Sequence, residues 1–169
     1  MKELFKNYYN SPIGLIEIAA TQTDIKEISF IDSEFTLNTN SSPLADECYK
    51  QLDEYFKGER REFNLPLAPE GTEFQKRVWD ELLKIPFGET LSYLNQAVNI
   101  GDKKAIRAVA SANGQNKISI IIPCHRVIGT DGSLTGYAGG LWRKKWLLEH
   151  EDNLVGKEKQ LNFFGEDNA

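Results

Sequence analysis

Three short stretches near the start of the chain alternate apolar and polar residues. They span residues 4–9, 13–20 and 25–31, and the breaks between them carry Asn-Ser-Pro and a run of polar residues ending in aspartate. Such alternation predicts half-buried strands, and these residue types are typical of tight connections. We therefore expect a small antiparallel sheet at the N-terminus.

After a polar loop at residues 38–42, the apolar positions change to helical spacing. Pro43 suits a first helical turn, and Gly58 suits a helix end. One face of this predicted helix carries Leu44, Cys48, Leu52, Tyr55 and Phe56. Because Cys48 shares that face, we interpret it as a buried apolar side chain.

Residues 65–71 interrupt both periodicities, because two prolines and a glycine lie there. A second helix is predicted after this break, with Thr72 as its N-cap and Pro86 as its limit. Its apolar face carries Phe74, Val78, Trp79, Leu82 and Leu83. We place a domain boundary at the break, which predicts domains at residues 1–70 and 71–152 and a tail at residues 153–169.

A compact pair of helices is predicted next. Ser92 is a candidate cap for a short helix through Val98, and Asp102 is a candidate cap for a helix over residues 103–112, with Gly101 in the turn. This is the outline of a helix-turn-helix, although many helical hairpins share it.

The second helix of this pair surrounds a single arginine, Arg107, with small side chains. They are Ala105, Ala108, Ala110, Ser111 and Ala112. Small side chains would let the helix backbone enter a narrow groove. The alternative is that the alanines pack against neighbouring helices, which leaves the arginine unexplained.

The composition indicates a globular protein. The 169 residues, 40% hydrophobic and 27% charged, suffice for one compact domain or two small ones. No apolar run approaches the length of a membrane span, and the N-terminus lacks a secretory signal, so we expect a cytoplasmic protein without membrane contact. Two cysteines and two histidines are too few for a disulfide framework or paired zinc ligands.

The net charge of −5 is unevenly distributed. Residues 1–70 carry a net −6, residues 71–150 a net +4 and residues 151–169 a net −3. A basic segment permits contact with a polyanion such as nucleic acid. Ordinary surface variation explains the same asymmetry, so charge alone leaves the choice open.

One cysteine lies next to a histidine. An apolar run at residues 118–122 predicts a buried strand, and Pro123, Cys124 and His125 follow it directly. A thiolate is a nucleophile, and a nearby imidazole can take its proton. A structural cysteine beside an unrelated histidine is the commoner arrangement, so the pair alone does not decide.

Longer motifs around this cysteine resemble the O6-alkylguanine-DNA alkyltransferases. They are TEFQKRVWDELLKIPFGETLSY, AIRAVASANGQN, IPCHRVIG and SLTGYAGGLWRKKWLLEHE, which together cover about half of the chain. The N-terminal part resembles the family more loosely, through CYKQLDEYFKGERREFNLPL. The resemblance implies an α+β fold, with a small N-terminal RNase H-like antiparallel sheet plus helix, followed by a winged-helix-like (helix-turn-helix) domain.

The resemblance also implies a reaction. An alkyl group moves from O6 of guanine in duplex DNA, with O4 of thymine as a further candidate, to Cys124, and the stable thioether leaves the protein spent after one turnover. His125 matches the base that takes the thiol proton through a water, and Glu151 matches the carboxylate that orients it. Tyr137 matches the phenol that donates to the leaving guanine, and Asn116 matches a hinge asparagine.

For DNA, the resemblance implies minor-groove binding and rotation of the target nucleotide out of the duplex. Arg107 matches the residue that fills the vacated stack, and Tyr93 matches the residue that presses on the target phosphate. Three small residues belong to the helix that enters the groove: Ala105, Ala108 and Ser111. The residues matched to the substrate pocket are Val127, Ala138, Gly139 and Lys144.

The chain departs from the family pattern in two places. Relatives with a zinc site carry several cysteines and histidines in the N-terminal domain, where this chain offers only Cys48, so we expect no metal and no cofactor. Ala138 stands where some relatives have serine, which removes one hydrogen bond to the alkylated oxygen. We expect a monomer.

An apolar cluster interrupts the acidic tail at residues 160–164. Gln160, Leu161, Phe163 and Phe164 resemble the peptide that docks in the groove of a bacterial sliding clamp. The alternative is that these apolar side chains fold back on the protein.

The residues argue against two other classes of function. A reader of alkylated DNA would keep the groove-binding helix without an acceptor thiol, and Cys124 argues against it. A cysteine hydrolase would need an oxyanion hole, for which no motif is evident.

Overall fold

The computed structural model describes residues 3–32 and 37–167, with side chains up to residue 156. The N-terminal sheet contains β1 (Phe5–Ser11), β2 (Gly14–Ala20) and β3 (Ile25–Ile31), in the order β1-β2-β3. Both pairs are antiparallel, and the first hairpin closes with Ser11 opposite Gly14. The predicted sheet is confirmed, with β1 starting one residue later and ending two residues later than the alternation indicates, because Ser11 still pairs with Gly14.

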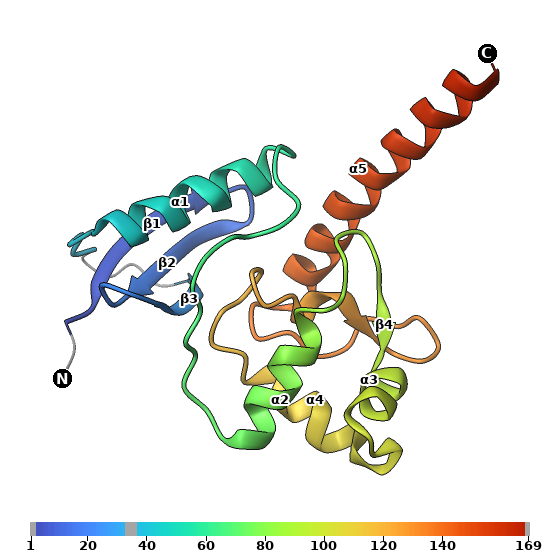
Figure 1. Cartoon of the computed structure of the whole chain (residues 1–169), viewed down its shortest axis with the longest axis horizontal. Helices are drawn as coiled ribbons and strands as arrows, with labels where there is room; N and C mark the ends of the chain where they lie inside the picture. Colours follow the sequence, from blue (N-terminus) through green and yellow to red (C-terminus); the bar gives the residue numbers. More distant parts are fainter. Residues whose placement is uncertain (1–2, 33–36, 168–169) are drawn as a thin grey trace.

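Helix α1 (Pro43–Phe56) lies along this sheet (Figure 1). Its N-cap is Ser42, whose hydroxyl accepts a hydrogen bond from the Ala45 amide at 3.1 Å. The predicted apolar face points into the core, and Cys48 is fully buried there. The interpretation of Cys48 as a buried apolar residue is confirmed.

An extended connection crosses from α1 to α2 (Glu73–Leu82) (Figure 1). Thr72 and Gln75 form a reciprocal capping box at the start of α2, which confirms the predicted cap. The helix ends at Leu82 rather than at Pro86, because the Ile85 amide turns back to the Leu82 carbonyl.

The predicted helical pair is present as α3 (Tyr93–Ile100) and α4 (Ile106–Gly114), and Ser92 caps α3. The start of the second helix differs from the prediction. Asp102 instead caps a 3-10 turn, η1 (Lys103–Ala105), because the Ala105 amide bonds to the Asp102 carbonyl. The reciprocal side-chain amides of Gln96 and Asn113, both buried, join α3 to α4 at 2.9 and 2.7 Å.

The prediction of a strand at residues 118–122 is wrong. These residues are buried, but only Ile118 pairs with β3, through Ile28, and the chain then coils into consecutive turns. Ile120 has a φ of +72°, which no strand residue adopts. The apolar residues of this run are explained by their burial. The backbone is not extended here, and its turns lead the chain back toward the helices.

The last helix, α5 (Leu141–Asp167), begins beside the short parallel pair β4 (Leu91–Ser92) and β5 (Val127–Ile128) and extends away from the rest of the molecule (Figure 1). It crosses the predicted boundary between residues 152 and 153 without a break. The predicted clamp-binding side chains Gln160, Leu161, Phe163 and Phe164 lie outside those described. None of the helices in the described part of the chain combines the length and apolar character that crossing a membrane requires.

The two halves of the chain share one core. Edge strand β3 pairs with the connection through Ile25, whose amide donates to the Pro66 carbonyl, and with the loop before Cys124 through Ile28, whose amide donates to the Lys117 carbonyl. The sheet therefore supports the loop that presents Cys124. The boundary near residue 70 stays a prediction.

Candidate active site

Cys124 opens a single 3-10 turn, η2 (Cys124–Arg126), at the end of the coiled loop. The side-chain amide of Asn116 makes three hydrogen bonds to this loop. Its Nδ2 donates to the Ile122 carbonyl at 2.8 Å and to Cys124 Sγ at 3.3 Å, and its Oδ1 accepts from the Ile118 amide at 2.9 Å. Asn116 thus bridges the end of the helical pair to the sulfur.

Cys124 as a whole residue is 8% exposed. Burial raises the pKa of Cys124 above its ordinary value, while the Asn116 hydrogen bond and the Lys144 charge act to lower it. The resting side chain is therefore a thiol at neutral pH, and it needs a base before it can act as a nucleophile.

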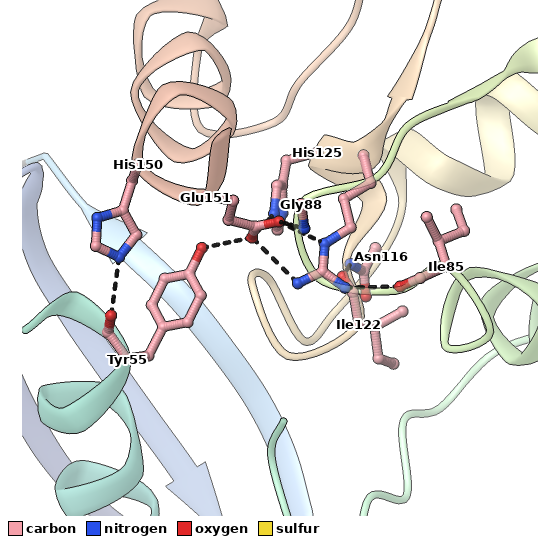
Figure 2. A network of polar contacts seen from close by, with 9 residues as sticks. Tyr55, Ile85, Gly88, Asn116, Ile122, His125, His150 and Glu151 are labelled. Carbon is pink, nitrogen blue, oxygen red and sulfur yellow. Dashed lines mark hydrogen bonds and ion pairs between the residues drawn. The ribbon is translucent and has the colours of Figure 1, made fainter. Parts of the chain in front are cut away.

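Glu151, on α5, is a buried carboxylate beside η2 (Figure 2). Its Oε2 bonds to His125 Nε2 at 2.7 Å, and Arg126 donates to Oε1 from Nε at 2.8 Å and to Oε2 from Nη2 at 3.1 Å. Burial acts to raise the pKa of Glu151, but the bonds from His125 and Arg126 outweigh it and hold the pKa well below the usual range. Glu151 is ionised.

Two further donors reach the same carboxylate. The Tyr55 hydroxyl, from α1, donates to Oε2 at 2.7 Å, and the Gly88 amide donates to Oε1 at 3.0 Å (Figure 2). Gly88 has a φ of +80°, and a Cβ there would lie 2.3 Å from a methyl group of Val155, so only glycine fits this turn against α5.

These bonds fix the tautomer of His125. An ionised carboxylate only accepts, so Nε2 carries the ring hydrogen and Nδ1 carries the lone pair. Within the described part of the chain, Nδ1 is buried and has no hydrogen-bond partner. Burial lowers the pKa of His125 more than Glu151 raises it, so the ring is neutral at rest and Nδ1 is free to take a proton.

Tyr137, in the loop before α5, and Lys144, near the start of α5, complete the surroundings of the sulfur. The Tyr137 hydroxyl is buried, and no described residue lies in hydrogen-bond geometry with it. Burial together with the Cys124 sulfur raises the pKa of Tyr137 well above the ordinary value. Lys144 is fully buried and donates to the Thr135 carbonyl at 2.9 Å. Burial lowers the pKa of Lys144 to about 8, so the ammonium loses its proton more readily than an exposed lysine.

Arg143 fastens this loop to the N-terminal sheet. Its guanidinium donates to the Gly139 carbonyl at 3.0 Å and the Ile13 carbonyl at 2.7 Å, and it pairs with Asp32 at 2.6 Å. A Cβ at Gly139 would approach both Phe30 and Tyr137 to 2.9 Å. Gly139 therefore allows the loop to lie close to the sheet and to Tyr137.

The remaining predicted site residues lie at different depths. Val127 is fully buried in β5, whereas Ala138 is exposed. Tyr93 is half-buried, and its hydroxyl donates to the Thr135 carbonyl at 2.9 Å. The face of α4 turned to solvent carries Arg107, Ala108 and Ser111, while Ala105, just before α4, is half-buried.

Sequence reasoning missed three polar residues of the site. Tyr55 was assigned only to the apolar face of a helix, and Arg126 and Arg143 were assigned no role. Their partners lie far along the chain, with Tyr55 and Glu151 separated by 96 positions. Only Arg126 has a local signal in the sequence, because it directly follows His125.

Two family profiles match the chain. Residues 4–69 match "6-O-methylguanine DNA methyltransferase, ribonuclease-like domain", and residues 73–153 match "6-O-methylguanine DNA methyltransferase, DNA binding domain". The methylated-DNA–protein-cysteine methyltransferase of Methanosarcina barkeri is 45% identical over 155 residues, which is 89% of this chain and 98% of that protein. The constitutive enzyme of that name from Bacillus subtilis is 40% identical over 164 residues, or 90% and 99% of the two chains.

Solved structures give the same result. O6-methylguanine methyltransferase from Mycobacterium tuberculosis superposes with a TM-score of 0.81 at 42% identity, covering 89% of this chain and 94% of that one. A structure of the M. tuberculosis protein in complex with DNA superposes equally well, with a TM-score of 0.81 at 43% identity over the same shares.

Proposed function

The chain belongs to the 6-O-methylguanine DNA methyltransferase family, which repairs DNA by moving a methyl group onto a cysteine of the protein itself, and we propose that Cys124 is that cysteine. The observation that carries the proposal is the arrangement of three groups. A buried thiol directly precedes a neutral histidine whose Nδ1 is unpartnered, and the Nε2 of that histidine bonds to the ionised Glu151.

In the proposed reaction His125 Nδ1 takes the thiol proton through a bridging water. The sulfur then attacks the alkyl carbon, the bond between this carbon and O6 of guanine breaks, and its electron pair stays on the purine. Tyr137 stabilises the developing negative charge by donating a hydrogen bond from its hydroxyl to a ring nitrogen of the guanine. The product thioether does not hydrolyse, so each molecule reacts once.

The substrate base is proposed to lie between β5 and the loop that carries Tyr137. The backbone carbonyls of Cys124 and Val127 would accept from the exocyclic amine, and Gly139 would keep the rim low. Ala138 offers no side-chain hydrogen bond, so donors to the alkylated oxygen would come from backbone amides. Lys144 supports the thiolate electrostatically, because its charge lowers the pKa of Cys124.

Duplex DNA is proposed to bind over α4. The exposed face of α4 combines one long cationic side chain with two small ones, at Arg107, Ala108 and Ser111. This combination suits close approach to a minor groove. Arg107 would fill the space left by the rotated nucleotide, at a cost of a few kcal/mol for unstacking. Tyr93 would press on the target phosphate.

Intact mass measurement tests the acceptor. After incubation with duplex DNA containing O6-methylguanine, we expect a stoichiometric gain of one methyl group, lost in Cys124→Ala and retained in Cys48→Ala. DNA binding without any gain of mass would instead indicate a reader, and repeated turnover would indicate a hydrolase. The same assay with O4-methylthymine decides whether that base is a second substrate.

The role of Arg107 is tested by comparing two substrates. Arg107→Ala should slow transfer from duplex DNA about tenfold or more while leaving transfer from free O6-methylguanine near the wild-type rate, because only the duplex requires nucleotide rotation. Lys50→Ala, which removes an exposed cation on α1, is the control and should change neither rate. Equal losses on both substrates in Arg107→Ala would contradict stack filling.

A further inference from the structure

The N-terminal domain contributes a side chain to the catalytic carboxylate. The Tyr55 hydroxyl bonds to Glu151 Oε2 at 2.7 Å, and the same oxygen bonds to His125 Nε2 at 2.7 Å (Figure 2). Tyr55 is fully buried. Burial and the neighbouring Glu151 raise its pKa well above the ordinary value, so this phenol is always a donor.

Tyr55 is also held at its other end. His150, the neighbour of Glu151 on α5, bonds through Nε2 to the Tyr55 carbonyl at 2.8 Å, and its ring stacks on Trp146 with centroids 4.9 Å apart. The Tyr55 ring packs against Phe63 and Phe87. Two successive residues of α5 therefore hydrogen-bond to one tyrosine of α1. Together with the ring contacts, these bonds hold the Tyr55 hydroxyl against Glu151 Oε2.

We propose that Tyr55 is a positioning residue for the reaction, which shares Glu151 Oε2 with His125 and thereby limits how strongly this carboxylate attracts the imidazole. The inference rests on the proposed function, in which neutral His125 is the base. A carboxylate oxygen that already accepts one strong hydrogen bond is a weaker acceptor for the next. Through this contact the N-terminal domain sets the protonation of a ring in the other domain.

The groups around the pair define the expected direction. The ionisable side chains that face His125 are Glu151 and Lys144 of α5, Cys124 and Arg126 of η2, and, through Glu151, Tyr55 of α1. Removal of the Tyr55 hydroxyl leaves the others in place and strengthens the attraction of Glu151 for His125. The pKa of His125 should then rise, so more of the ring is protonated near neutral pH and unable to act as a base.

The test is Tyr55→Phe, which keeps the ring and removes the hydroxyl. The acid limb of the single-turnover rate of methyl transfer, measured at saturating duplex DNA, should move up by about half a pH unit or more. NMR titration of the His125 ring in the free protein should show the same shift. Tyr9→Phe is the matched control, because Tyr9 is a buried tyrosine of the same domain whose hydroxyl donates to Asp53, at 3.0 Å.

A purely structural role predicts that both variants lose stability and keep the wild-type pH profile, which would overturn the proposal. Replacing Tyr55 with 3-fluorotyrosine gives a second test with the opposite sign. The more acidic phenol donates a stronger bond, so the His125 pKa should fall, whereas exposure of the ring to solvent would raise it, because burial is what lowers it. If wild-type protein gains a methyl group but neither substitution moves the His125 titration, the inference fails while the proposed function stands.

Discussion

The two cysteines lie in two different kinds of protein interior. Cys48 is fully buried on the regular α1, and burial with the nearby Glu47 raises its pKa to about 12. Cys124 is also buried, but Asn116 and Lys144 partly oppose the effect of burial on its pKa, and the His125 imidazole follows it directly. Burial protects both thiols at rest, and the polar partners of Cys124 give only this one a route to the thiolate.

The backbone differs in the same way. Around Cys48 the strands and α1 satisfy the main-chain groups with regular hydrogen bonds. Around Cys124 the chain is irregular, Ile120 adopts a left-handed conformation at a cost of about 1–3 kcal/mol, and the Asn116 side chain supplies bonds that a strand would have supplied. The interior around Cys124 is thus the strained one, and its backbone conformation depends on a few side chains such as Asn116.

Removing a carboxylate should affect methyl transfer and stability far more near Cys124, where the charge is buried, than in the domain that holds Cys48. Glu151→Gln leaves Arg126 buried without a counter-ion and His125 without its orienting carboxylate. We expect methyl transfer to fall about hundredfold or more and the free energy of unfolding to fall by about 3 kcal/mol. Asp53→Asn removes a carboxylate paired at the surface with Lys57, and it should cost less than about 1 kcal/mol and leave the transfer rate unchanged.

The stability part of this prediction has a definite pH dependence. The pKa of Glu151 is lowered in the folded protein, so its stabilising contribution is fully present above the ordinary glutamate pKa and is lost as the pH falls toward the folded value. Urea unfolding at several pH values should show the gap between wild type and Glu151→Gln closing below about pH 4. A gap that stays constant into strong acid would show that the charge is not its source.

The regular region could be predicted from local pattern, and the reactive one only in part. The three strands and the caps at Thr72 and Ser92 follow from alternation and residue type, because their hydrogen-bond partners are close in the chain. The run at residues 118–122 has the composition of a strand, yet tertiary contacts impose turns. The proposed acceptor Cys124 lies in a motif that can be read from the sequence, whereas the Tyr55 contact with Glu151 depends on how α1 and α5 pack.

A smaller effect is expected from the amides that tie down a loop in each region. Asn116 ties the loop before Cys124, and Gln51 ties the connection after α1 by bonding to both the amide and the carbonyl of Asn64. Alanine at either position should lower the free energy of unfolding by about 1–2 kcal/mol. Only Asn116→Ala should also slow methyl transfer, by about tenfold, because it frees the sulfur and the loop together. Equal transfer rates in the two variants would remove the distinction between these loops.

The smallest effect should come from the buried ammonium of Lys144. Folding lowers its pKa to about 8, so between pH 8 and the ordinary lysine value the unfolded chain binds more protons, and stability rises with pH there. Lys144→Met removes this dependence. Relative to wild type, the variant should therefore be most favoured below about pH 8 and lose that advantage above about pH 10.5.

The same substitution should slow methyl transfer at neutral pH, by about fivefold, because Cys124 loses the positive charge that lowers its pKa. Lys145→Met is the control, since Lys145 is exposed on α5 and pairs with Glu149 at the surface. If Lys144→Met gains relative stability at neutral pH and transfers methyl groups more slowly, then the buried charge of Lys144 lowers the stability of the fold while it favours the reaction of Cys124. If Lys144→Met and Lys145→Met behave alike in both measurements, the charge of Lys144 contributes nothing to the reactivity of Cys124, and the contrast between the two thiols must come from Asn116 and His125.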